Sequence, residues 1–192
     1  MTSMIRLSPR AWFLLGGLFC VGLILAALYF QFVGGLDPCP LCISQRVLVI
    51  AVGLIMLAAA AHNPGPVGVR AYAVLGAATA LVGASISARH VWIQHLPASE
   101  VPACGPGLSY MFRYFPLTDT LRAMVTGTGD CAKVDWTLLG LSMPAWVLIS
   151  FIALAALNLG QLWNVSRGSV GGPRRGELKD PGMVTGRPAA KN

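Results

Sequence analysis

Four long apolar blocks set the pattern of the chain. The blocks are residues 11–32, 47–61, 71–88 and 144–162. Their apolar residues follow one another almost without a break, and a helix of about 20 mostly apolar residues crosses the core of a bilayer. The second block reaches that length only with residues 41–45. The pattern predicts four spanning helices, at about 11–32, 42–61, 71–91 and 143–163, with loops at about 33–41 and 92–142 on one side.

The composition indicates that lipid is the main solvent of this chain. Of 192 residues, 55% are hydrophobic and only 11% are charged, whereas a soluble domain carries about 25% charged residues. The first block is too long for a cleaved signal peptide, whose apolar core has about 7–15 residues. We therefore expect an all-α integral membrane four-helix bundle formed by residues 1–165, with a permanent first helix.

Lysine and arginine residues predict the orientation of the helices. Nine of the 14 basic residues lie in the terminal segments and in the loop between the second and third helices, and basic loops stay on the cytoplasmic side of a membrane. Both termini are therefore expected to face the cytoplasm. Residues 166–192, rich in Gly, Pro, Arg and Lys, predict a disordered basic tail that contacts anionic lipid. The orientation of the helices and the basic tail explain the net charge of +7, so this charge does not indicate a nucleic-acid partner.

The long external loop contains one predicted helix, over residues 118–125. Thr118 or Asp119 is expected to cap it, and an apolar face would be shared by Leu117, Leu121, Met124 and Val125. Such a helix either lies flat on the membrane surface or packs as an ordinary loop helix.

Cys39 and Cys42 form a Cys-Pro-Leu-Cys motif just before the second helix. The motif is a redox pair, half of a metal site, or a chance occurrence. A helix start and a cation, here Arg46 one turn later, stabilise the thiolate that redox chemistry needs. Zinc requires two more ligands at suitable spacing, and although His90 and His95 exist, the remaining loop cysteines are far apart in the sequence. The spacing favours the redox interpretation.

Cys104 and Cys131 both lie in the long external loop, on the same side as the motif. They either staple the loop as a structural disulfide or form a second redox pair. Glycine-rich flanks, residues 105–107 and 127–129, favour a disulfide that is open to attack by a thiolate. Cys20, alone in the first helix, is expected to be a small buried apolar residue.

Two disulfide-capable pairs beside a membrane suggest a relay. Its electrons come from an external dithiol and end on oxygen or a lipid-soluble carrier. Arg46, at the edge of the bilayer, would hold a carbonyl oxygen and stabilise negative charge on a reduced acceptor. The alternative is an interfacial arginine that reaches to lipid phosphate.

These motifs, in this order, resemble the bacterial disulfide bond formation protein B (DsbB) family, the quinone-dependent membrane oxidases of the periplasm. The resemblance extends from about Trp12 to Trp163. Its specific elements are the run from Pro38 to Arg46, Cys104, the Gly-Asp-Cys sequence that ends at Cys131, and Trp136 with the run from Leu139 to Trp146.

The resemblance implies a defined path for electrons in the bacterial inner membrane. Cys104–Cys131 would oxidise a periplasmic DsbA-like thiol oxidase through a mixed disulfide. Cys39–Cys42 would then reoxidise that dithiol and pass two electrons to a quinone, ubiquinone or menaquinone. Arg46 falls on the family's quinone-binding arginine, and His90 falls where some members carry a histidine near the quinone. Some relatives have an acidic residue where this chain has Gln45, which removes a possible ion-pair partner of the arginine.

Two other classes of protein share part of this pattern. A vitamin K epoxide reductase-like protein also couples thiols to a quinone in a helical bundle. In that family the Cys-x-x-Cys follows the loop cysteines, whereas here it precedes them. A membrane protein that uses its cysteines as metal ligands or staples is the non-enzymatic alternative, and it predicts disulfides or bound metal that do not turn over.

Overall fold

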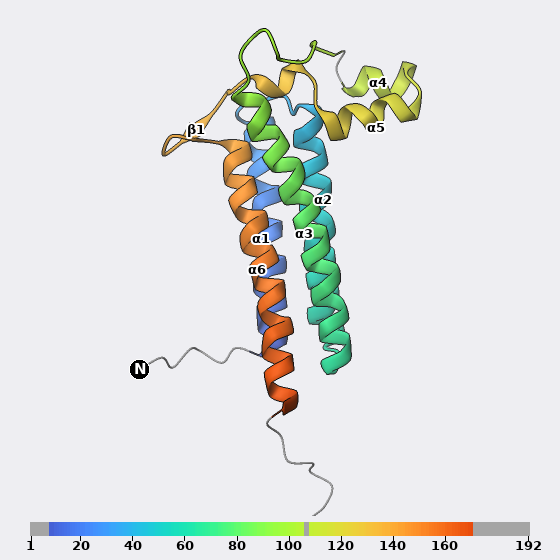
Figure 1. The fold of residues 1–192 in the computed structure, drawn as a ribbon, viewed down its shortest axis with the longest axis vertical. Coiled ribbons are helices and arrows are strands. Elements are labelled where there is room, and N and C mark those ends of the chain that lie inside the picture. Colours follow the sequence, from blue (N-terminus) through green and yellow to red (C-terminus); the bar gives the residue numbers. More distant parts are fainter. Residues whose placement is uncertain (1–7, 106–107, 171–192) are drawn as a thin grey trace, which may run out of the picture.

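The computed structural model describes residues 8–105 and 108–170. Within this part of the chain, four helices are long and apolar enough to cross a membrane. They are α1 (Pro9–Phe32), α2 (Pro40–His62), α3 (Pro66–Gln94) and α6 (Met143–Val170), which stand side by side in Figure 1. The predicted all-α, four-helix membrane bundle is confirmed.

Proline residues fix where three of the spanning helices begin. Pro9, Pro40 and Pro66 each occupy the first turn of their helix, where a missing N–H costs nothing because that group has no partner within the helix. The α2 helix ends at His62. Its C-cap residue, Asn63, adopts a left-handed conformation with φ of 45° and so turns the chain sharply into α3.

The helices pack in pairs through close contacts at glycine. The α3 helix packs along α6, α1 along α2, and α2 along α3, whereas α1 and α6 scarcely touch. A Cβ atom added to Gly83 would lie 2.3 Å from the Phe151 ring, and one added to Gly16 would lie 2.1 Å from Met56. Small residues of this kind let helix backbones approach closely in lipid, where apolar side chains gain little from meeting one another.

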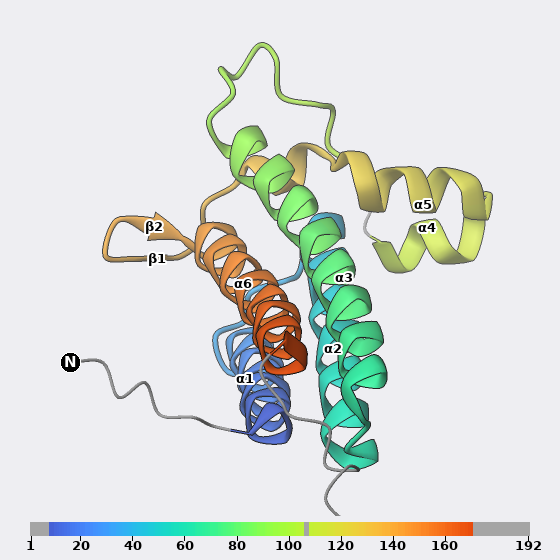
Figure 2. The same cartoon turned by 60° about the horizontal axis from the view of Figure 1, so that its bottom comes forward.

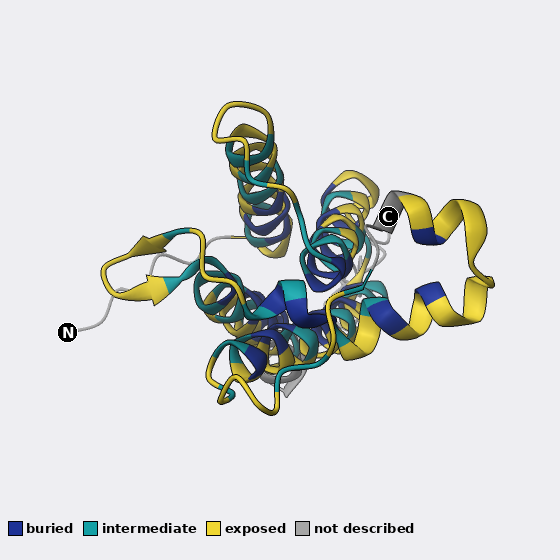
Figure 3. Cartoon of the chain, turned by 90° about the horizontal axis from the view of Figure 1, so that it is seen from above, coloured by how far each residue is buried: buried dark blue, intermediate teal, exposed yellow. Residues whose placement is uncertain are grey.

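Short elements cover one end of the bundle, the end that carries four of the cysteines. They are α4 (Leu108–Tyr114), α5 (Leu117–Thr126), the 3-10 helix η1 (Gly129–Ala132) and a hairpin of β1 (Thr137–Leu138) and β2 (Leu141–Ser142). Figures 1 and 2 show α4 and α5 projecting to one side and the hairpin to the other. The view from this end in Figure 3 shows buried residues gathered toward the bundle and exposed residues on the outer faces.

The predicted short helix is confirmed as α5, but its predicted cap is wrong. The helix begins at Leu117 after Pro116, and among the described residues no side chain caps it. Its leucine-bearing face is exposed, with Leu117 at 63% and Leu121 at 51% exposure, while Thr120 and Ala123 are buried. The α4 helix and the hairpin were not predicted.

The last spanning helix is longer than the sequence pattern indicated. It continues to Val170, past the predicted end at residue 163, so the first residues of the predicted tail are helical. Residues 171–192, the rest of the predicted tail, lie outside the described residues.

Candidate functional site

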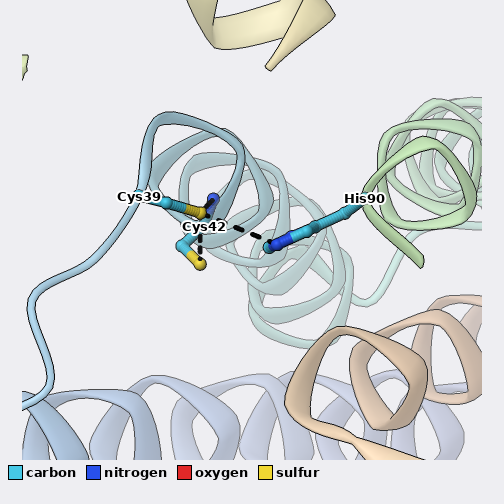
Figure 4. Close-up of side chains that lie close together, drawn as sticks. All are labelled: Cys39, Cys42 and His90. Atoms are coloured by element: carbon cyan, nitrogen blue, oxygen red, sulfur yellow. Dashed lines mark hydrogen bonds between the residues drawn. The ribbon is translucent and has the colours of Figure 1, made fainter. Parts of the chain in front are cut away.

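The Cys-x-x-Cys motif forms the start of α2. Cys39 is the N-cap, and its sulfur accepts a hydrogen bond from the Cys42 backbone N–H at 3.3 Å. The two sulfur atoms lie 2.9 Å apart, as Figure 4 shows. All five cysteines of the chain are free thiols in this structure. A disulfide between Cys39 and Cys42 would need only a small change in side-chain torsions.

His90 of α3 faces this pair across the bundle (Figure 4). Its Nε2 atom lies 3.7 Å from the Cys39 sulfur, and its Nδ1 atom accepts a hydrogen bond from the Gln45 side-chain amide at 3.1 Å. His90 is only 2% exposed and Gln45 only 4%. With Nδ1 accepting from Gln45, a neutral ring carries its proton on Nε2 and points it at the Cys39 sulfur.

Cys131, in the long loop, lies beside Cys39. It lies in η1, is fully buried, and packs with Leu41 and Ile93 beside Cys39. A hydrogen bond from the Cys39 thiol lowers the pKa of Cys131 to about 6, helped by the backbone N–H groups of Leu41 and Thr128. The same hydrogen bond raises the pKa of Cys39 above its usual range, because Cys39 supplies the shared proton. Cys131 is therefore the thiolate of this pair near neutral pH.

Two contacts hold the segment before Cys131 against α2 and α3. The Ser44 hydroxyl donates a hydrogen bond of 2.7 Å to the Met124 carbonyl. Gly127 has φ of +82°, and a Cβ atom there would lie 2.8 Å from both the Leu41 and Ile93 side chains. Only glycine fits this turn without strain and overlap, and the turn carries the chain from α5 into η1.

Cys104 lies at the outer side of the same cluster. It is exposed, and the neighbouring Ala103 carbonyl accepts a hydrogen bond of 3.2 Å from the Gly129 N–H. A Cβ atom on Gly129 would lie 3.0 Å from the Cys104 sulfur. The structure thus brings Cys104 against the 3-10 helix that carries Cys131, while Cys131 itself is directed inward to Cys39.

Arg46 lies one turn beyond Cys42 and is bound by α1. Its guanidinium donates hydrogen bonds to the Gln31 side-chain oxygen and, at 3.2 Å, to the Ala27 carbonyl. Gln45 and Arg46 are adjacent in the sequence, but they point to different helices. The role of Gln45 beside His90, and that of Gln31 beside Arg46, were not predicted.

The Cys-x-x-Cys pair, His90 and Arg46 line one cavity of about 730 Å³. This size is typical of sites for small molecules and cofactors. The polar part of its lining includes Cys39, Cys42, Gln45, Arg46 and His90, and also Gln31, Asp37, Gln94, Asp130, Lys133, Asp135 and Ser150. The apolar part comes mainly from α1 and α6, and includes Leu23, Ile24, Ala27, Phe30, Met143, Trp146 and Val147. The cavity therefore lies between the two helices that scarcely touch. The ligand atoms of Cys39, Cys42 and His90 all lie within 4.8 Å of one another, so the same groups also have the spacing of metal ligands.

Comparisons with known proteins agree over almost the whole hydrophobic part of the chain. The sequence model of the family described as "Disulfide bond formation protein DsbB" matches residues 9–160. Disulfide bond formation protein B of Methylococcus capsulatus is 70% identical over 160 residues, which are 83% of this chain and 98% of that protein. The protein of the same name from Nitrosococcus oceani is 49% identical over 164 residues, 85% and 97% of the two chains. Disulfide bond formation protein B 1 of Pseudomonas aeruginosa is 45% identical over 154 residues, 80% and 94% of the two chains. With four membrane-spanning helices and a match over most of its length, the chain belongs to the DsbB family of membrane disulfide bond formation proteins.

Proposed function

We propose that this protein is a membrane thiol:quinone oxidoreductase that reoxidises a periplasmic DsbA-like dithiol protein. Two cysteine pairs would act in series, Cys104–Cys131 toward the partner and Cys39–Cys42 toward the quinone. The observation that carries the proposal is the position of Cys39. Its sulfur lies 2.9 Å from that of Cys42 and shares a hydrogen bond with Cys131, so one sulfur links the external loop to the cavity.

The external half of the cycle begins at Cys104. In the oxidised protein, a thiolate of the partner attacks the exposed Cys104 sulfur, breaks the Cys104–Cys131 disulfide and releases Cys131 as a thiolate. Thiols with a low pKa are good leaving groups. The backbone N–H groups of Leu41 and Thr128 lower the pKa of Cys131, and they would still stabilise the departing thiolate while Cys39 is held in its disulfide. The second thiol of the partner then displaces Cys104. The partner leaves as a disulfide, and two electrons stay on Cys104 and Cys131.

The internal half passes these electrons inward. The Cys131 thiolate attacks the Cys39 sulfur of the Cys39–Cys42 disulfide and releases Cys42. Cys104 then attacks Cys131, which re-forms the loop disulfide and leaves Cys39 and Cys42 as the reduced pair. The hydrogen bond between Cys39 and Cys131 supports this step, because the attacking and attacked sulfur atoms are already neighbours.

The cavity fits a quinone as the final acceptor. Its polar lining would hold the headgroup, with Arg46 donating to a carbonyl oxygen, and its apolar lining from α1 and α6 would contact the isoprenoid chain. Arg46 uses two of its N–H groups on Gln31 and Ala27 out of the five that a guanidinium offers. A quinone held there, ubiquinone or menaquinone, would supply the acceptor for the two electrons and two protons that Cys39 and Cys42 lose as their disulfide re-forms. The Nε2–H group of His90, which points at the Cys39 sulfur, would stabilise a Cys39 thiolate during this transfer.

The proposed site of action is the bacterial inner membrane, with both termini in the cytoplasm and the cysteine-bearing end in the periplasm. A membrane-impermeant thiol reagent applied to spheroplasts under reducing conditions should label Cys104. It should not label a cysteine introduced by Ser166→Cys. Labelling of position 166 from outside would reverse the orientation, and a reducing compartment would then surround the site.

The decisive experiment is quinone reduction by the purified protein supplied with a reduced DsbA-type dithiol protein. We expect continuous turnover in the wild type and in Cys20→Ser, a control variant because Cys20 is buried in α1 against Gly53. Turnover should be lost in Cys39→Ser. A wild-type protein whose cysteines form stable disulfides without reducing quinone would instead be a stapled membrane protein, and the proposal would fail.

A further inference from the structure

The cluster of Cys39, Cys42 and His90 has the composition and spacing of a zinc site. Zinc binds thiolate sulfur at about 2.3 Å and imidazole nitrogen at about 2.0–2.1 Å in a tetrahedral arrangement. This geometry separates two sulfur ligands by about 3.8 Å, and a sulfur from a nitrogen by about 3.6 Å. The Cys39 sulfur lies 3.7 Å from His90 Nε2, which already matches. The two sulfur atoms, 2.9 Å apart, would have to separate by roughly 0.9 Å, which torsion of the Cys42 side chain can provide.

Gln45 provides the outer support that metal-binding histidines usually have. Such a histidine donates its other ring N–H to an oxygen atom, which fixes the ring and its tautomer. The Gln45 amide lies 3.1 Å from His90 Nδ1, and both side chains are almost fully buried. Rotating the amide end of Gln45 would present its oxygen to a protonated Nδ1. The lone pair of Nε2 would then face the two sulfur atoms.

We propose that the reduced protein binds one Zn²⁺ ion at Cys39, Cys42 and His90, and that this ion holds the cysteine pair in its dithiol form. All three ligands line the cavity, from which a water molecule would complete the four-coordinate site. Each thiol gives up one proton on binding. The two thiolates balance the charge of the ion, and no electrons are transferred.

The binding is selective for one redox state. A Cys39–Cys42 disulfide has no thiolate to offer, so the oxidised protein lacks two of the three ligands. Because Zn²⁺ binds only the reduced form, it raises the equilibrium ratio of reduced to oxidised protein. The ratio rises by a factor of 1 + [Zn²⁺]/Kd, where [Zn²⁺] is the free zinc concentration and Kd is the dissociation constant of the site. Zinc would therefore stop turnover between substrate oxidation and electron transfer to the acceptor, and a chelator would restore it.

The test is metal binding by the full-length protein in detergent, reduced with a phosphine that contains no thiol. Co²⁺ serves as the visible probe. We expect one equivalent to bind with the intense absorption of a tetrahedral site and a sulfur-to-cobalt charge-transfer band, to be displaced by Zn²⁺, and to release about two protons. Cys39→Ser should lose the site, and His90→Ala should bind at least about tenfold more weakly. Gln45→Leu should weaken binding by about ten- to a hundredfold, as loss of an outer partner usually does.

Two matched variants and the oxidised protein complete the design. His95→Asn changes a histidine that lies exposed at the end of α3, and Cys20→Ser changes a cysteine in α1. Both should bind Co²⁺ as the wild type does, and the protein oxidised at Cys39–Cys42 should not. A reduced wild type without the charge-transfer band, or equal binding by Cys39→Ser or by the oxidised protein, would overturn the proposal. Because the readout is binding rather than turnover, either result leaves the proposed oxidase activity to its own test.

Discussion

Replacing Arg46 with alanine tests whether its guanidinium binds the electron acceptor. The side chain lines the cavity one turn beyond Cys42 and is held at α1 by Gln31 and Ala27. A cation in this position would stabilise both the Cys42 thiolate and negative charge on a reduced headgroup. Its loss should therefore affect acceptor binding and electron transfer, but not the reaction of Cys104 with the partner.

The expected size of the effect follows from the type of bond removed. A hydrogen bond to a charged group is worth about 1.5–3 kcal/mol, and each 1.4 kcal/mol is tenfold in affinity. The apparent quinone KM should thus rise about ten- to a hundredfold in Arg46→Ala, with a lower kcat. The two hydrogen bonds to α1 are also lost. Their donor is the charged guanidinium, so each contributes up to about 1.5–3 kcal/mol to stability, and a fall in thermal stability should accompany the kinetic change.

The assay is steady-state quinone reduction at varied quinone, with a single-turnover measurement of partner oxidation beside it. Arg46→Lys keeps the charge without the planar fork and should recover only part of the affinity. Arg70→Ala, which removes an exposed arginine at the opposite end of α3, is the matched control and should behave as the wild type. An unchanged quinone KM in Arg46→Ala would make Arg46 an interfacial anchor and refute this reasoning.

Three further results are expected. Cys42→Ser should oxidise one equivalent of the partner with its loop disulfide and then stop; continued turnover would make the loop pair the whole enzyme. Because the pKa of Cys131 is lowered from 9.0 to about 6, its thiolate should persist in the reduced protein down to about pH 6 and be lost below it. The measurement is the ultraviolet thiolate absorption of the wild type minus that of Cys131→Ser. Cys39→Ala should move this midpoint up toward 9.0, and a midpoint that stays near 6 would mean that Cys39 is not the donor. Gly127→Ala and Gly140→Ala both place alanine at positive φ, at a cost of about 1–3 kcal/mol, but of the two only Gly127 has close neighbours. Overlap should add about 1–3 kcal/mol there, so Gly127→Ala should have the lower Tm in detergent; equal Tm values would contradict the packing of this turn.

The spanning helices could be predicted because lipid makes them a local property of the sequence. A backbone in the bilayer core must satisfy its own hydrogen bonds, so an apolar run of sufficient length becomes a helix whatever surrounds it. The loop elements have no such constraint. Pro116 starts α5 through its own backbone geometry, so the helix does not need the side-chain cap that was expected at Thr118 or Asp119. The α4 helix was missed because its sequence has no clear amphipathic pattern.

The candidate site was predicted by residue type but not by arrangement. Successive residues on a helix point about 100° apart, so Gln45 and Arg46 had to diverge, but the sequence does not say which helix each would meet. The structure places Gln45 at His90 of α3 and Arg46 at Gln31 of α1. Contacts of this kind depend on how three helices are rotated about their axes, and that rotation is a property of the whole bundle.

The scant contact between α1 and α6 determines which measure of acceptor concentration is relevant to the kinetics. If the acceptor reaches the cavity between these helices, it arrives from the bilayer, where the relevant quantity is the number of acceptor molecules per lipid rather than per litre of buffer. A KM measured in detergent would then scale with the amount of detergent, because extra micelles dilute the acceptor without changing its bulk molarity. Rates measured in different membrane mimetics become comparable once they are plotted against mole fraction. A strongly hydrophobic quinone can thus saturate the protein at a bulk concentration that would be negligible for an enzyme in water.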